Sequence, residues 1–78
     1  MSWNYRVIRE DFKDGYSSFS IHEVYYNNQG EIDGWSKDPV NIGYFDHREE
    51  IQKDLKLIRK ALNRPTLLLI SEEKLKEI

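Results

Sequence analysis

The sequence predicts one α+β domain over residues 1–78, built as a three-stranded antiparallel meander followed by one main helix (β-β-β-α). Three β-prone runs are separated by glycine-containing turns, which is the pattern of two consecutive hairpins. Behind them, one stretch repeats apolar residues at helical spacing. A chain of 78 residues buries only a thin core, and this one has no cysteine with which to reinforce it.

The first predicted strand covers residues 3–9, where apolar and polar side chains alternate. Asp14-Gly15 then favours a two-residue type I′ turn, because both central residues of that turn need positive φ. This turn places Ile8 opposite Ile21. A longer loop over residues 11–16 instead shifts the register by one residue and exchanges the two faces of the strand.

The second hairpin spans residues 20–37 and begins with the β-branched and aromatic run 24–26. Two asparagines precede Gly30, which is typical of a three-residue loop that ends in a left-handed glycine and forms a bulge. We therefore expect Asn27 to lie opposite Glu31, with the pairing continuing without interruption along the returning strand.

The main helix is predicted to begin at Asp46, an N-cap residue with Glu49 at capping-box spacing. It carries one apolar stripe, formed by Ile51, Leu55, Ile58 and Leu62 with Ala61 beside it. Asn63, as a left-handed C-terminal residue, and the proline two positions later end it. Acidic residues fill its first half and basic residues its second half, as the helix dipole favours.

The residues behind the helix leave alternatives open. The apolar run 67–70 is compatible with a fourth short strand or with a packed extended tail. Ser71 is a suitable N-cap for a short C-terminal helix over residues 72–78.

These pairings sort the sheet into two faces. The face assigned to the core, beneath the helix, holds Trp3, Tyr5, Val7, Val24, Tyr26, Ile32 and Gly34. Because one helix covers one face only, the other face remains near solvent as a predicted partner-binding surface made of Trp35, Tyr25, Ile21, Phe19 and Ile8, flanked by Arg6 and Glu23. This surface predicts a non-enzymatic interaction module that binds a protein partner or forms a homodimer, unless the run 67–70 folds over it.

Other function classes find less support. The net charge is −2 with 33% charged residues, which argues against nonspecific binding of nucleic acid. Single-stranded RNA binding is an alternative, through a group formed by Arg6, Arg9, Lys37, Tyr25 and Trp35. His22 and His47 are the only imidazoles and would have to converge with a carboxylate for acid-base or metal chemistry. We therefore expect no catalytic residues, no cofactor and no metal site.

The N-terminus lacks an apolar segment behind a basic start, and no apolar run approaches the roughly 20 residues that a bilayer requires. We expect a cytoplasmic protein without a membrane partner.

The sequence also resembles known groups. The run IHEVYY at residues 21–26, followed by Gly30, Trp35, Asp38-Pro39-Val40, a capped helix and Arg64-Pro65, resembles a group of short bacterial proteins without an assigned activity, over residues 3–70. The order of strands, helix and a further strand is similar to HicB-like antitoxin domains. That resemblance implies an antitoxin-like protein. A small acidic chain of this kind is equally compatible with a phage-type inhibitor, and both are protein-binding roles.

Overall fold

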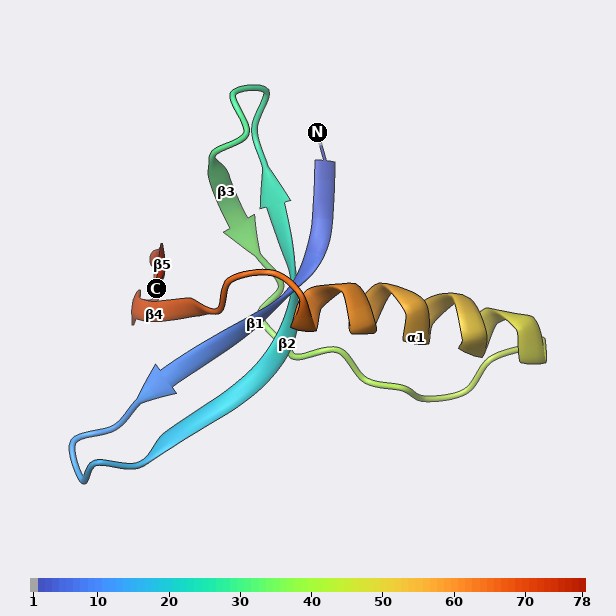
Figure 1. The fold of residues 1–78 in the computed structure, drawn as a ribbon, viewed down its shortest axis with the longest axis horizontal. Helices are drawn as coiled ribbons and strands as arrows, with labels where there is room; N and C mark the ends of the chain where they lie inside the picture. The colour runs from blue at the N-terminus through green and yellow to red at the C-terminus, as the bar shows by residue number, and fades with distance from the viewer. Residues whose placement is uncertain (1) are drawn as a thin grey trace.

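The computed structural model describes residues 2–78. Its elements are, in chain order, β1 (Ser2–Asp11), β2 (Ser17–Tyr26), β3 (Ile32–Trp35), α1 (Arg48–Leu62), β4 (Leu67–Ser71) and β5 (Lys74–Glu77). The strands form one curled sheet in the order β3-β2-β1-β4-β5 (Figure 1). The sheet is mixed, because β1 and β4 run parallel while the other neighbours run antiparallel.

The predicted fold class, a three-stranded meander with one helix, is wrong. The residues behind the helix are part of the sheet, since β4 lies directly beside β1 and β5 forms the edge. Parallel pairing needs a long connection that returns the chain to the same end of the sheet, and residues 36–66 with α1 supply it. Local sequence patterns identify such a run as β-prone but do not say which strand it joins.

The short C-terminal helix predicted over residues 72–78 is a strand instead. Glu72 and Glu73 form a tight turn, in which the Glu73 backbone N–H donates to Ser71 Oγ at 3.3 Å. A serine makes this local hydrogen bond at a helix N-cap as well as in a turn, so its presence does not decide between them. Leu75 pairs with Leu69 across the two strands, and this contact favours the strand.

The loop between β1 and β2 has three residues, 13–15, rather than the predicted two. The Phe12 N–H donates to the Tyr16 carbonyl at 2.8 Å and closes the loop. Gly15 takes a φ of +86°, so the glycine serves as the left-handed residue of a bulged loop rather than as half of a type I′ turn. The pairing of β1 with β2 is therefore shifted by one residue, and Ile8 lies opposite Ser20.

The loop of the second hairpin is confirmed. The Asn27 N–H donates to the Glu31 carbonyl at 2.9 Å, and Gly30 has a φ of +79°. The same loop type therefore closes both hairpins.

Beyond that loop, the pairing of β2 with β3 departs from the prediction because β3 contains a bulge. Tyr25 lies opposite Gly34 rather than Asp33, and Val24 lies opposite Trp35 rather than Gly34. The bulge turns the Trp35 side chain to the face that carries Val24.

These two shifts redistribute the side chains between the faces. The core face holds the buried residues Ile8, Val24 and Leu67, against which Tyr26, Ile32, Trp35, Leu69 and Leu75 pack. The opposite face, here called the helix face, carries Trp3, Tyr5, Val7, Phe19, Ile21, Glu23 and Tyr25. The predicted core is thus wrong as a set: its β1 members lie on the helix face, and Val24, Tyr26 and Ile32 lie on the core face.

The ends of α1 also differ from the prediction. The N-cap is His47 rather than Asp46, and no side chain of the described residues caps the first turn. Asn63 ends the helix in a right-handed conformation, with φ −92° and ψ −2°. Gly34, expected to admit the helix, lies instead 4.0 Å from the ring of Tyr25, measured from the position that a Cβ would occupy.

Candidate protein interface

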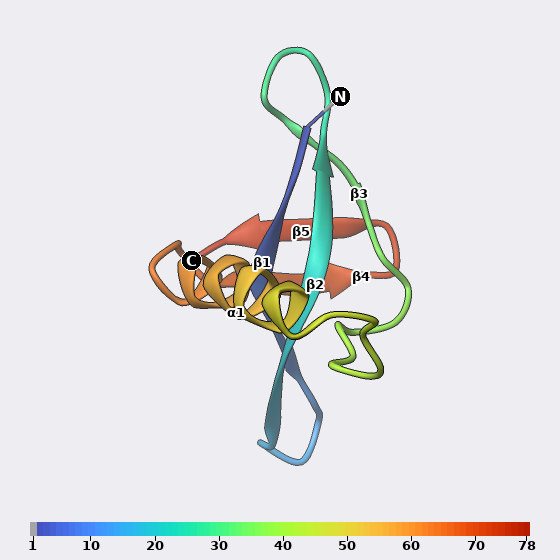
Figure 2. The same ribbon diagram turned by 90° about the vertical axis from the view of Figure 1, so that its right-hand side faces the viewer.

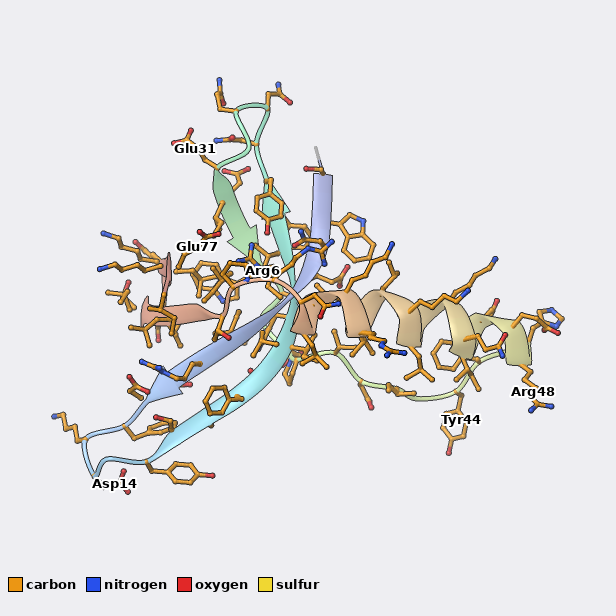
Figure 3. All side chains as sticks on the ribbon, viewed as in Figure 1. Arg6, Asp14, Glu31, Tyr44, Arg48 and Glu77 are labelled. Carbon is orange, nitrogen blue, oxygen red and sulfur yellow. The ribbon has the colours of Figure 1, made fainter. Side chains whose placement is uncertain are left out.

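The chain is unusually extended for its size. Its accessible surface is 6392 Å², whereas a monomer of its mass exposes about 5,000 Å². Its radius of gyration is 13.5 Å, against roughly 11.5 Å for a compact chain of this length. Helix α1 contributes to this shape because it projects away from the strands (Figure 1). In Figure 2 the same helix is seen nearly end-on. Its C-terminal end adjoins the sheet, and Arg48 lies at the outer end (Figure 3).

The apolar stripe of α1 is mostly uncovered. Within the helix, all of which the structure describes, Ala61 is the one buried residue. The helix packs against β1, where the Tyr5 hydroxyl donates to Asp54 Oδ1 at 2.9 Å, and the buried Ala61 lies about two turns further along the same line of the helix. Leu55 comes directly after Asp54 in the sequence, and Leu62 comes directly after Ala61. Successive helical residues are rotated by about 100°, so both leucines are turned away from that line. They are consequently 47% and 67% exposed, so this part of the stripe faces solvent beside the sheet, whereas Ile58, which is nearer to that line, is half-buried.

Further large apolar side chains are exposed on the first hairpin and on the segment that leads to the helix. They are Trp3, Phe12, Tyr16 and Phe19 near the long strands, and Ile42 and Tyr44 in the segment 36–47. The rings of Phe12 and Tyr16 lie beside the loop, tilted by 31° to each other with centroids 6.0 Å apart. Phe19, which is 64% exposed, lies opposite Arg9 on the helix face. The uncovered apolar surface therefore includes the helix and part of the helix face.

The predicted partner-binding residues do not form one surface. Four of them, Phe19, Ile21, Glu23 and Tyr25, lie on the helix face as a row along β2. The other three, Arg6, Ile8 and Trp35, lie on the core face. The set is split because the longer first loop moves the β1 residues to the other face and the bulge in β3 moves Trp35.

Arg6 is a structural residue rather than a surface contact, since it is 5% exposed. Its guanidinium donates to the Tyr26 hydroxyl at 2.9 Å, to the Pro65 carbonyl at 2.7 Å and to Glu77 Oε1 at 3.2 Å. Figure 3 shows Arg6 and Glu77 together near the crossing of the strands. Arg6 thereby ties β1 to β2, to the chain behind α1 and to the edge strand β5.

A cavity of about 460 Å³ lies between the sheet, α1 and the segment 36–47. Among the described residues 2–78, three carboxylates line it, from Glu23, Asp38 and Asp54, and no basic side chain does. Burial, and next the hydrogen bond to Asp54, raises the pKa of Tyr5 in its wall to about 12. At neutral pH the Tyr5 hydroxyl is therefore a donor, and the cavity presents acceptors that suit a cationic group.

A second hollow of about 840 Å³ separates β3 from the β4–β5 hairpin. Its apolar lining includes Ile32, Trp35, Leu69 and Leu75, which also pack on the core. Charged side chains of both signs surround them, from Asp33, Lys37, Glu72, Glu73 and Lys74. Trp35 thus lies at an open groove on the core face, away from the projecting helix.

The two imidazoles lie on separate elements. His22 Nδ1 donates to the Ser36 carbonyl at 2.9 Å, and its Nε2 pairs with the Ser20 hydroxyl at 2.9 Å, so both ring nitrogens are occupied within the sheet. His47 is the N-cap at the outer end of α1. Across the described residues 2–78, no three His, Cys, Asp or Glu side chains gather closely enough to hold a metal ion. Over the same residues, no helix combines the length and the apolarity needed to cross a membrane.

Comparisons with known proteins add no assignment. No family model, curated protein or solved structure matches this chain.

The exposed stripe of α1 is the part of the candidate interface that the sequence did not predict. Its four residues are evident from their spacing, but we expected them beneath the sheet. One feature of the sequence indicates that the stripe is exposed. The side of the helix that is turned to the sheet carries a small residue, Ala61, and an acid, Asp54, rather than large apolar residues.

Proposed function

We propose that this chain is a non-enzymatic protein-interaction module that docks through the apolar stripe of α1 and the adjoining helix face. The observation that carries this proposal is the projecting helix, whose leucines at 55 and 62 are 47% and 67% exposed. Exposed apolar surface of this kind marks binding sites on soluble proteins. The interface differs from the aromatic sheet face predicted from the sequence, because that face does not exist as one surface.

The alternatives have less support. Single-stranded RNA binding requires Tyr25 and Trp35 to present their rings together, and the two lie on opposite faces. Arg6, one of the three cations of that alternative, is buried and donates to internal hydrogen bonds. An antitoxin-like or phage-type inhibitor remains a specific form of the proposal, since such a protein acts by binding another protein.

The proposal is tested by capture from cells that express the protein. The variant Leu55→Asp/Leu62→Asp places two charges on the stripe. The matched control, Lys53→Gln/Lys60→Gln, makes the same change in net charge on the opposite side of the helix. We expect wild type and control to retain the same proteins and the stripe variant to lose them. If all three retain the same proteins in the same amounts, α1 is not the docking surface. Circular dichroism of each variant establishes that it is folded.

A further inference from the structure

We propose that the partner is a second copy of this chain, and that the two α1 helices pack antiparallel along their apolar stripes. This inference rests on the proposed function, because it assigns the occupant of the same surface. Three observations support it: the excess of exposed area, the charge distribution along α1, and the position of the helix relative to the sheet.

The area fits a stable dimer. The chain exposes about 1,400 Å² more than a compact monomer of its mass. Specific interfaces bury about 800 Å² per partner and permanent ones more. The excess is therefore of the size that one permanent interface removes. A permanent interface needs a partner that is always present in equal amount, and a second copy of the chain meets that condition.

The charges along α1 favour the antiparallel arrangement. Residues 46–54 carry four acids and two bases, for a net charge of −2, whereas residues 55–64 carry four bases and no acid, for +4. An antiparallel pair brings the acidic half of each helix beside the basic half of the other. A parallel pair would bring like halves together, which costs energy at an interface.

The geometry of the stripe is also compatible with a twofold pair. Centred between Leu55 and Ile58, an antiparallel pair places Ile51 against the Leu62 of the second copy, and the reverse, so that every stripe residue meets an apolar partner. The helix is about 22 Å long, and its inner end adjoins the sheet. The outer half of each helix therefore reaches the helix face of the other sheet, where Phe19 is 64% exposed. This arrangement accounts for a helix that projects beyond its own sheet.

Disulfide trapping tests both the partner and the orientation, because the chain has no cysteine of its own. Ile51→Cys on a tagged chain is mixed with Leu62→Cys on an untagged chain, refolded together and oxidised, so that the three crosslinked products differ in mass. We expect the mixed product to exceed each self-linked product several-fold. The control pair, Lys53→Cys with Lys60→Cys, places both thiols on the opposite side of the helix and should give little crosslinking. Analytical ultracentrifugation of the wild type should show a dimer in the micromolar range.

Each other outcome overturns the inference. Dominant self-linked products at position 51 would show parallel helices. A wild-type monomer throughout the micromolar range would remove the second copy as the partner. If that monomer still captures another protein through Leu55 and Leu62, the proposed function stands and only the identity of the partner is wrong. If capture is also insensitive to those residues, both proposals fail.

Discussion

Arg6→Ala should be the most damaging single polar substitution on the core face. The change removes three donated hydrogen bonds, to Tyr26, Pro65 and Glu77. The Pro65 carbonyl loses a charged donor, for about 1 to 2 kcal/mol, and the Tyr26 hydroxyl loses about 1 kcal/mol because it still donates to Asn4. Glu77 is 63% exposed, so water replaces its partner at a cost of about 0 to 1 kcal/mol. With about 1 kcal/mol for the lost packing of the aliphatic stem, the sum is about 3 to 5 kcal/mol.

Two variants make this measurement specific. Arg9→Ala removes an arginine whose side chain is 32% exposed and pairs with Asp11 on the same strand, and it should cost less than about 1 kcal/mol. Arg6→Met keeps most of the apolar stem and removes the buried Nε, which has no hydrogen-bond partner among residues 2–78, so it should cost markedly less than Arg6→Ala. Urea unfolding followed by circular dichroism at one fixed chain concentration measures all three. If Arg6→Ala costs no more than Arg9→Ala, the network does not hold β5 and the chain behind α1 to β1.

Two further predictions concern the loops and the cavity. Gly15→Ala and Gly30→Ala should each lower the free energy of unfolding, measured in urea, by about 1 to 2 kcal/mol because both glycines have positive φ. The control Gly43→Ala, at a glycine without positive φ or a close neighbour, should be neutral or slightly stabilising. Equal effects at all three positions would contradict the loop assignment. The pKa of Tyr5, raised from 10.0 to about 12, means that the folded state holds the proton more tightly than the unfolded chain. The stability that the neutral hydroxyl contributes is therefore complete below pH 10 and is lost as the pH rises toward 12. The difference in tyrosinate absorbance between wild type and Tyr5→Phe should give that pKa, and Asp54→Asn should lower it; a titration midpoint that Asp54→Asn leaves unchanged would refute the role of the carboxylate.

The sequence predicted the local elements better than their arrangement. Three strands and a helix exist where alternation and helical spacing placed them, since these patterns depend on neighbouring residues. The predicted pairing of β1 with β2 was wrong because the loop between them has one residue more than predicted. Asp14-Gly15 suits a two-residue turn as well as the second half of a three-residue loop, and only the closing bond from Phe12 to Tyr16 distinguishes them. Because side chains alternate with a period of two, that one residue exchanged the faces of β1.

The candidate site depended on the same register and was therefore only partly predictable. An excess of apolar surface over what one helix can cover was expected, and the exposed residues agree with it, but the named residues were divided between two faces. The bulge that reorients Trp35 has no local signal beyond Gly34, which sequence reasoning interpreted as room for a helix. The buried role of Arg6 depends on β5, whose place beside β4 is a long-range pairing that no short pattern reports.

An amphipathic pattern states that one side of a helix will be buried, but not against what. In α1 the pattern was interpreted as a contact with its own sheet, yet the sheet contacts the line of Asp54 and Ala61. Among residues 2–78, four apolar side chains are buried: Ile8, Val24, Ala61 and Leu67. A core of that size makes a small domain marginal on its own. If the stripe is buried between two copies, Leu55 and Leu62 both stabilise the fold and form the interface. The free energy of unfolding should then rise with chain concentration. Leu62→Asp should abolish that dependence, whereas the control Lys60→Gln should retain it.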